Sequence, residues 1–142
     1  MPTRNELKRI ATTRLKEAKA LHDKGLYDGS VYLAGYVVEI ALKARICKIL
    51  KEPLYPDTGR IGSLYKTHNM DDLATLAGLR VQLDQKLSIE PQFRSNWTLV
   101  TRWNEALRYR PIGSATQSEA TRLINALEDI NEGVFTWIKK RW

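Results

Sequence analysis

The sequence predicts an all-α fold, a five-helix antiparallel up-and-down bundle with a long loop after the second helix. Apolar residues recur three and four positions apart along most of the chain, and no stretch alternates with the period of two that a strand needs. The 142 residues suit one domain, so residues 1–142 are expected to form a single bundle. A composition of 43% hydrophobic and 27% charged residues is typical of a folded globular protein.

The first predicted helix covers residues 4–24 and is amphipathic. Its apolar residues fall on one face: Leu7, Ile10, Ala11, Leu15, Ala18 and Leu21. Gly25 follows Lys24 at the position where a glycine commonly ends a helix. We therefore expect the chain to turn at Gly25 and to start a second helix soon after it.

The second predicted helix begins at Asp28 or Ser30, runs to residue 50 and is apolar on almost all sides. Such a helix is expected to be buried by several neighbours, as the central helix of the bundle. Its charged residues make a membrane span too costly: Glu39, Lys43, Arg45 and Lys48. Glu39 lies four residues before Lys43, which is the favourable order for an ion pair within a helix.

Residues 51–67 carry two prolines and two glycines and form the longest predicted loop. The DTGRIGS run in this loop lacks the spacing of a phosphate-binding loop, and no strand precedes it. A short third helix is expected to start at His68 or Asn69, with Asn69 as its N-terminal cap. His68 is read as a residue at the start of this helix. Residues 79–90 are expected to form a turn of helix and a loop.

Pro91 suits the first turn of the fourth helix, which is expected to run to Tyr109 and to end before Pro111. Ser114 or Thr116 is expected to open the fifth helix, which continues to the basic KKRW ending. Its buried stripe is expected to contain Ile124, Leu127, Ile130, Val134, Trp137 and Ile138.

The chain is basic, with 23 Lys and Arg against 16 Asp and Glu and a formal net charge of +7. This excess favours an anionic partner such as nucleic acid, although it also serves solubility. The single cysteine, Cys47, excludes an internal disulfide, and with two histidines it makes no convincing zinc site, so we predict no metal and no cofactor. The first ten residues lack the apolar segment of a signal peptide, and we expect a cytoplasmic location.

The segment TRWNEALRYRP, residues 101–111, carries the strongest functional signal. On a helix that starts at Pro91, Arg102, Glu105 and Tyr109 fall on one side, with Arg94 beside them. The opposite side is a predicted core stripe of Phe93, Trp97, Val100, Trp103 and Leu107. A guanidinium, a carboxylate and a phenol on one face could bind phosphate or transfer protons. The same three residues also suit an ordinary solvated face or a dimer seam.

Two segments together resemble the HEPN family, whose members are small all-helical domains of toxin–antitoxin and anti-phage systems. AGYVVEIALKA, residues 34–44, resembles the family's second helix, and THNMDDLATLAG, residues 67–78, resembles the start of its third. The Arg-rich ending at residues 103–109 sits where the family carries its functional motif.

The family's ribonuclease motif is an Arg, four to six arbitrary residues and a His, with a Tyr two positions further on in some members. Arg102 and Tyr109 match this motif, whereas Leu107 occupies the His position. By this resemblance, Arg102 would stabilise the charge that develops on the phosphorus, but leucine cannot accept the 2′-hydroxyl proton. Glu105, one turn from Arg102, is the substitute base that we consider.

The resemblance implies first a binding or regulatory module of a toxin–antitoxin or anti-phage type system. Such a module would be a homodimer that contacts RNA, a nucleotide or a minimal nucleotidyltransferase partner, with Arg94, Arg102 and Arg108 on phosphate and Tyr109 as the residue that the partner modifies. An alternative is a metal-independent ribonuclease that uses Arg102 with Glu105 or Tyr109. A further alternative is a purely structural or oligomerisation bundle, so enzymatic activity stays open.

Overall fold

The computed structural model describes residues 1–142, which form eight α-helices, one 3-10 helix and no β-sheet. The helices in chain order are α1 (Arg4–Asp23), α2 (Tyr27–Leu50), α3 (Gly59–Tyr65), α4 (Met70–Leu76), α5 (Arg80–Ile89), α6 (Pro91–Thr101), η1 (Glu105–Tyr109), α7 (Gln117–Glu128) and α8 (Val134–Lys139). The all-α prediction is confirmed. The prediction of five helices in an up-and-down bundle is wrong, because two predicted loops contain helices and two predicted helices are broken.

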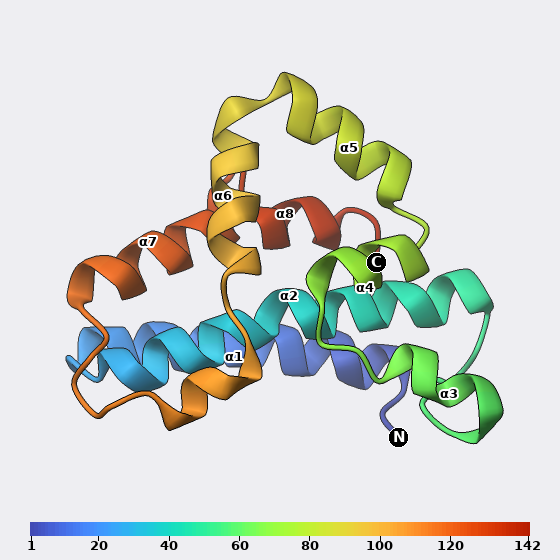
Figure 1. Cartoon of the computed structure of the whole chain (residues 1–142), viewed down its shortest axis with the longest axis horizontal. Coiled ribbons are helices and arrows are strands. Elements are labelled where there is room, and N and C mark those ends of the chain that lie inside the picture. The colour runs from blue at the N-terminus through green and yellow to red at the C-terminus, as the bar shows by residue number, and fades with distance from the viewer.

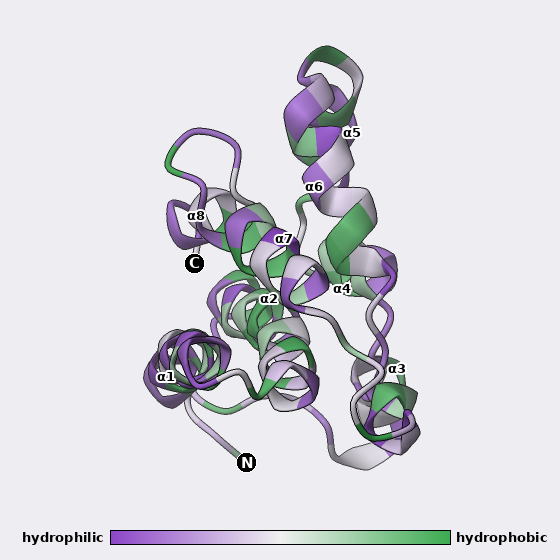
Figure 2. Ribbon diagram, turned by 90° about the vertical axis from the view of Figure 1, so that its left-hand side faces the viewer, coloured by the Kyte–Doolittle hydropathy of each residue, from purple (hydrophilic) through white to green (hydrophobic).

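The long helix α2 is the centre of the fold, as predicted. In Figure 1 it lies alongside α1, with α7 and α8 on its other side, while α6 crosses this layer instead of running parallel to it. The end-on view in Figure 2 shows α5 and the start of α6 projecting beyond the other helices. Val37, Val38, Ala41 and Leu42 are fully buried, so α2 is enclosed on all sides along its middle. No helix combines the length and the apolar character that crossing a bilayer requires.

The predicted turn at Gly25 is confirmed by its hydrogen bonds. Gly25 has φ +74°, the left-handed conformation that glycine adopts without steric cost. Its N–H donates to His22 O at 3.0 Å, and Leu26 N–H donates to Leu21 O at 2.9 Å. This pair of bonds satisfies carbonyls that the end of α1 would leave free and turns the chain directly into α2.

Helices α3 and α5 correct the predictions for residues 51–67 and 79–90. Residues 51–67 carry α3 because one side of the segment is anchored to the core. Tyr55 is buried, and its hydroxyl donates to Tyr65 O at 2.7 Å, at the end of α3. Helix α5 buries Leu83, which packs into the core. At the start of the preceding helix α4, the predicted cap Asn69 accepts a hydrogen bond from Asp72 N–H. Tertiary contact therefore outweighs the local proline and glycine signals.

The predicted helix from Pro91 to Tyr109 ends at Thr101 instead, and its last part is the 3-10 helix η1. Two side chains explain the break. Trp103 is buried against α2, which directs the chain away from the axis of α6. Asn104 is extended (φ −147°, ψ 164°), and its Oδ1 accepts from Ala106 N–H at 3.0 Å, so Asn104 caps η1. The predicted face of Arg102, Glu105 and Tyr109 on one α-helix therefore does not form.

The predicted last helix is also broken, at Asp129. Asp129 Oδ1 accepts from the N–H groups of Asn131 at 3.0 Å and Glu132 at 2.7 Å, a local turn that competes with the helix. Ile130 lies in this turn and is 80% exposed, so its predicted place in the buried stripe is wrong. The other five residues of that stripe are buried: Ile124, Leu127, Val134, Trp137 and Ile138.

Candidate functional site

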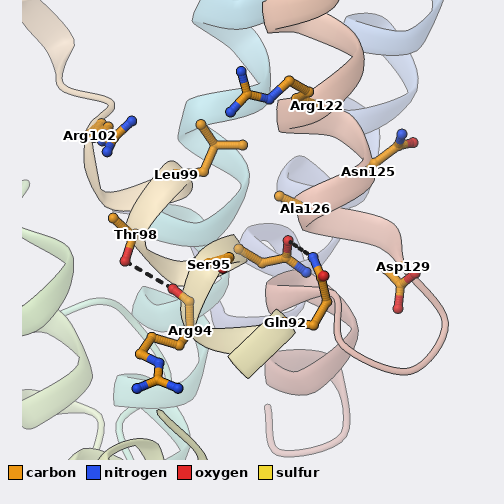
Figure 3. A pocket seen from close by; sticks show the side chains of 11 residues that line it. Gln92, Arg94, Ser95, Thr98, Leu99, Arg102, Arg122, Asn125, Ala126 and Asp129 are labelled. Carbon is orange, nitrogen blue, oxygen red and sulfur yellow. Dashed lines mark hydrogen bonds between the residues drawn. The ribbon is translucent and has the colours of Figure 1, made fainter. Parts of the chain in front are cut away.

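A polar pocket of about 530 Å³ opens between α6 and α7 (Figure 3). Three arginines line it: Arg94 and Arg102 from α6 and its end, and Arg122 from α7. In Figure 3 the guanidinium groups of Arg102 and Arg122 lie toward the same end of the pocket, with Leu99 between them. The remaining lining is mostly polar: Gln92, Ser95, Asn96, Thr98, Asn125, Ala126 and Asp129.

None of these three arginines forms an ion pair or a side-chain hydrogen bond within the protein, whereas other arginines of the chain do. Arg110, for example, donates to both carboxylate oxygens of Glu119, at 2.7 and 3.0 Å. An arginine held in this way has little capacity left for a ligand. Asp129 also lines the pocket, but it forms no ion pair with these arginines, so the pocket between α6 and α7 keeps a net positive charge, with planar donor groups that suit phosphate oxygens.

A hydrogen-bonded chain fixes the two walls of this pocket relative to each other. Gln92 Nε2 donates to Asn96 Oδ1 at 3.1 Å, and Asn96 Nδ2 donates to Glu132 O at 2.9 Å, in the turn after α7. Asn96 is only 7% exposed, so this link between α6 and the α7–α8 turn is shielded from water. A shielded amide bridge keeps the backbone that carries the arginines in a defined position.

The sequence-predicted site residues are divided among different places. Arg94 and Arg102 share the α6–α7 pocket, but Arg108 lines a separate pocket of about 300 Å³, where its guanidinium lies 5.0 Å from the ring centroid of Tyr109. Glu105 lines a third cleft and does not line the pocket of Arg102. Tyr109 is 77% exposed on η1. The break after Thr101 separates these side chains.

The loop that follows η1 is tied to the start of α2 by Asp28. Its Oδ2 accepts from Gly113 N–H at 2.6 Å, and its Oδ1 accepts from Ala115 N–H at 2.9 Å. These bonds, that from Gly113 first, stabilise the carboxylate and lower the pKa of Asp28 below its ordinary value. Asp28 thus fixes the segment that joins η1 to α7, and so helps to place Arg108 and Tyr109 beside α2.

The third cleft, of about 400 Å³, lies between the segment before α4 and the end of α6. His68 and Lys66 line one side, while Thr101, Trp103, Asn104 and Glu105 line the other. His68 Nδ1 lies 2.9 Å from Oε1 of Glu39, a buried residue of α2. The reading of His68 as a residue at the start of a helix describes its position, just before the cap Asn69, but misses this contact.

Sequence reasoning missed Arg122, which lines the α6–α7 pocket, and the contact between Glu39 and His68 beside the third cleft. Arg122 lies on the polar side of an amphipathic helix, and nothing in its spacing indicates that it faces α6. Glu39 and His68 are 29 positions apart and meet only through the packing of the segment before α4 on α2. Such juxtapositions arise from tertiary structure and leave no local pattern.

Comparison with known protein families gives one match. A family model described as the HEPN domain matches residues 5–137, which include both walls of the α6–α7 pocket and the cleft of His68. Searches of the curated proteins and of the solved structures give no match.

Proposed function

Because this chain belongs to the HEPN family, we propose that it is an RNA-binding module of a toxin–antitoxin or anti-phage type system that holds the phosphate backbone in the α6–α7 pocket. The observation that carries this proposal is the set of three arginines without carboxylate partners, Arg94, Arg102 and Arg122, in a single pocket. The net charge of +7 supports it, because it attracts a polyanion over a longer range.

The proposal predicts that RNA affinity falls as the salt concentration rises, and that Arg102 contributes directly to the steepness of this fall. Each phosphate contact to single-stranded RNA adds about 0.7 to the slope of log affinity against log salt, so Arg102→Gln is expected to reduce the slope by about that amount. Fluorescence anisotropy with a labelled single-stranded RNA at several salt concentrations measures this slope.

A matched control is Arg60→Gln, which removes the same charge from the exposed surface of α3, outside the α6–α7 pocket. This variant is expected to keep the wild-type slope. Equal changes in the two variants would show that general charge, and not the pocket, determines binding. Absence of RNA binding by the wild-type protein at low salt would refute the proposal.

Two alternatives receive less support from the geometry. A ribonuclease built on Arg102 with Glu105 needs both groups on one substrate, yet the two line different pockets. A ribonuclease that pairs Arg102 with Tyr109 meets a similar difficulty, since Tyr109 lines neither of these pockets. A purely structural bundle gives no reason for three unpaired arginines to share a pocket.

The exposed segment after η1 suits protein contacts, and we place the proposed homodimer seam there. Tyr109 is 77% exposed, and Ile112 is fully exposed. HEPN domains often dimerise, and a second copy would cover this apolar surface. We expect Ile112→Asp to convert a dimer into a monomer in analytical ultracentrifugation, with Ile130→Asp, at an exposed isoleucine beyond α7, as the control that stays dimeric. A wild-type monomer at micromolar concentration would contradict this placement.

In the monomer, before a second copy covers this surface, the exposed hydroxyl of Tyr109 is accessible to a minimal nucleotidyltransferase partner, as in the family members whose motif tyrosine is modified. Intact-mass spectrometry of protein purified from cells that co-express such an enzyme should then show a nucleotide adduct. The adduct should be absent from Tyr109→Phe. An unmodified wild-type protein would remove Tyr109 as a target of the enzyme tested.

A further inference from the structure

The pocket of about 300 Å³ that Arg108 lines lies between the start of α2 and the segment from η1 to α7, and we call it the α2–η1 pocket. Its volume is at the lower end of the range for small-molecule sites, about 300–1,000 Å³. It shares no lining residue with the α6–α7 pocket or with the cleft of His68. The proposed RNA contact therefore leaves the α2–η1 pocket without a function.

Most of the interior of the α2–η1 pocket is apolar. Val31 of α2 and Ala115 before α7 are only 4% and 7% exposed, so they form its floor. Leu107 of η1 lines the same pocket and packs against the core. Tyr32 adds an aromatic ring, and Ile112 lies at the exposed edge. An interior of this kind favours a ligand with an apolar body, because the ligand removes these surfaces from water.

The charged residues of the α2–η1 pocket differ in what they already bind. Asp28 accepts from two backbone N–H groups of the loop after η1, and Arg110 donates to both carboxylate oxygens of Glu119. Arg108 has no carboxylate partner in the protein, unlike the arginines that form ion pairs. The guanidinium of Arg108 is therefore the one uncompensated charge of this pocket.

These charges match a ligand with a single negative charge. The planar guanidinium of Arg108 can donate two parallel hydrogen bonds to a carboxylate. The hydroxyl of Tyr32 lies 3.0 Å from that of Tyr36, and when Tyr36 donates, Tyr32 can donate to the same carboxylate. A doubly charged phosphate suits the pocket less, because only one guanidinium is free and Asp28 adds a negative charge to the wall.

We propose that the α2–η1 pocket binds a small monocarboxylic acid with an aromatic or branched apolar body. The carboxylate lies on Arg108, and the apolar body lies against Val31, Leu107 and Ala115. This site is independent of the proposed RNA binding, because it uses none of the arginines of the α6–α7 pocket. All nine lining residues belong to one chain, so the pocket is complete in the monomer. Ile112, at its edge, also belongs to the proposed dimer seam.

The test uses 3-phenylpropionate, which joins one carboxylate to an apolar body. Saturation-transfer NMR titrates it against the wild-type full chain, at a protein concentration at which sedimentation shows a monomer. We expect a Kd on the order of 1 mM, as suits a ligand of about eleven non-hydrogen atoms. The neutral 3-phenylpropanamide should bind about 10-fold more weakly, because it lacks the charge-assisted bonds. Acetate and inorganic phosphate, which lack the apolar body, should also bind at least about 10-fold more weakly.

Arg108→Gln should bind 3-phenylpropionate about 10-fold more weakly and should no longer distinguish the acid from the amide. Arg60→Gln is the matched control, because it removes the same charge from the exposed surface of α3, and it should keep both wild-type affinities.

Four results would overturn the proposal. The first is no saturable binding of 3-phenylpropionate by the wild type up to about 10 mM, ten times the expected Kd. The second is equal affinity for the acid and the amide, and the third is phosphate binding as tight as that of the acid. The fourth is an unchanged preference for the acid in Arg108→Gln. The first three need no variant, and Arg108 is exposed, so a folding defect does not obscure the result.

Discussion

Gly35→Ala is expected to destabilise the protein by about 3 kcal/mol, the upper part of the range for overpacked cores. A Cβ at position 35 would lie 2.0 Å from both Cδ1 and Nε1 of the Trp103 indole, far inside van der Waals contact. The indole cannot move aside freely, because it is 5% exposed and packs 4.5 Å from the ring of Tyr36. Either the aromatic cluster opens or α6 and η1 shift away from α2.

Denaturant unfolding measures the loss of stability in Gly35→Ala, and Gly29→Ala in the same helix is the control variant. A Cβ at position 29 meets only the flexible end of Leu21, at 3.1 Å. Alanine also favours a helix over glycine by about 0.5–1 kcal/mol, so Gly29→Ala should be close to neutral or slightly stabilising. Equal stability of the two variants would contradict the packing of Trp103 on Gly35. Displacement of Trp103 should also weaken RNA binding, because the same chain segment positions Arg102.

Gly35 illustrates what sequence reasoning could and could not establish for the fold. The apolar character of residues 30–50 predicted a central helix, and α2 is one. The end of α1 at Gly25 and the start of α4 at Asn69 were also predictable, because glycine and asparagine act there through local backbone geometry. That Gly35 must lack a side chain follows only from its contact with Trp103, on a segment far along the chain.

The broken helices were missed for a related reason. Apolar residues keep a helical spacing across residues 91–109, and Leu107 of η1 still packs against the core, although η1 has no fully buried residue. The decisive features are the side chains of Asn104 and Asp129, which bond to nearby backbone N–H groups. Asn and Asp also occur within helices, so their identity alone does not predict a break.

The same break limits how much of the site the sequence could predict. Arg94 and Arg102 line the same pocket, because both belong to α6 or its end. Glu105 and Arg108 follow the break, and their predicted association with Arg102 depended on a helix that does not continue. Arg122 and His68 come from other parts of the chain, and only the tertiary fold brings them beside α6 or its end.

Glu39→Met alone is expected to destabilise the protein by about 3 kcal/mol, the lower end of the range for removing one member of a buried ion pair. Lys43 is 16% exposed, so its ammonium group would lose its carboxylate partner in a largely buried position. The double variant Glu39→Met/Lys43→Met should recover most of the loss, because two apolar side chains of similar volume replace both charges together. Unfolding measurements on the two single variants and the double variant give the coupling free energy between Glu39 and Lys43.

The pair of Arg14 and Glu17 on α1 is the control, because its side chains are 35% and 43% exposed and an ion pair in contact with water contributes only about 0–1 kcal/mol. Glu17→Met should therefore change stability little, and the double replacement should show little coupling. If Glu39→Met is equally mild, the buried pair does not stabilise the fold as argued.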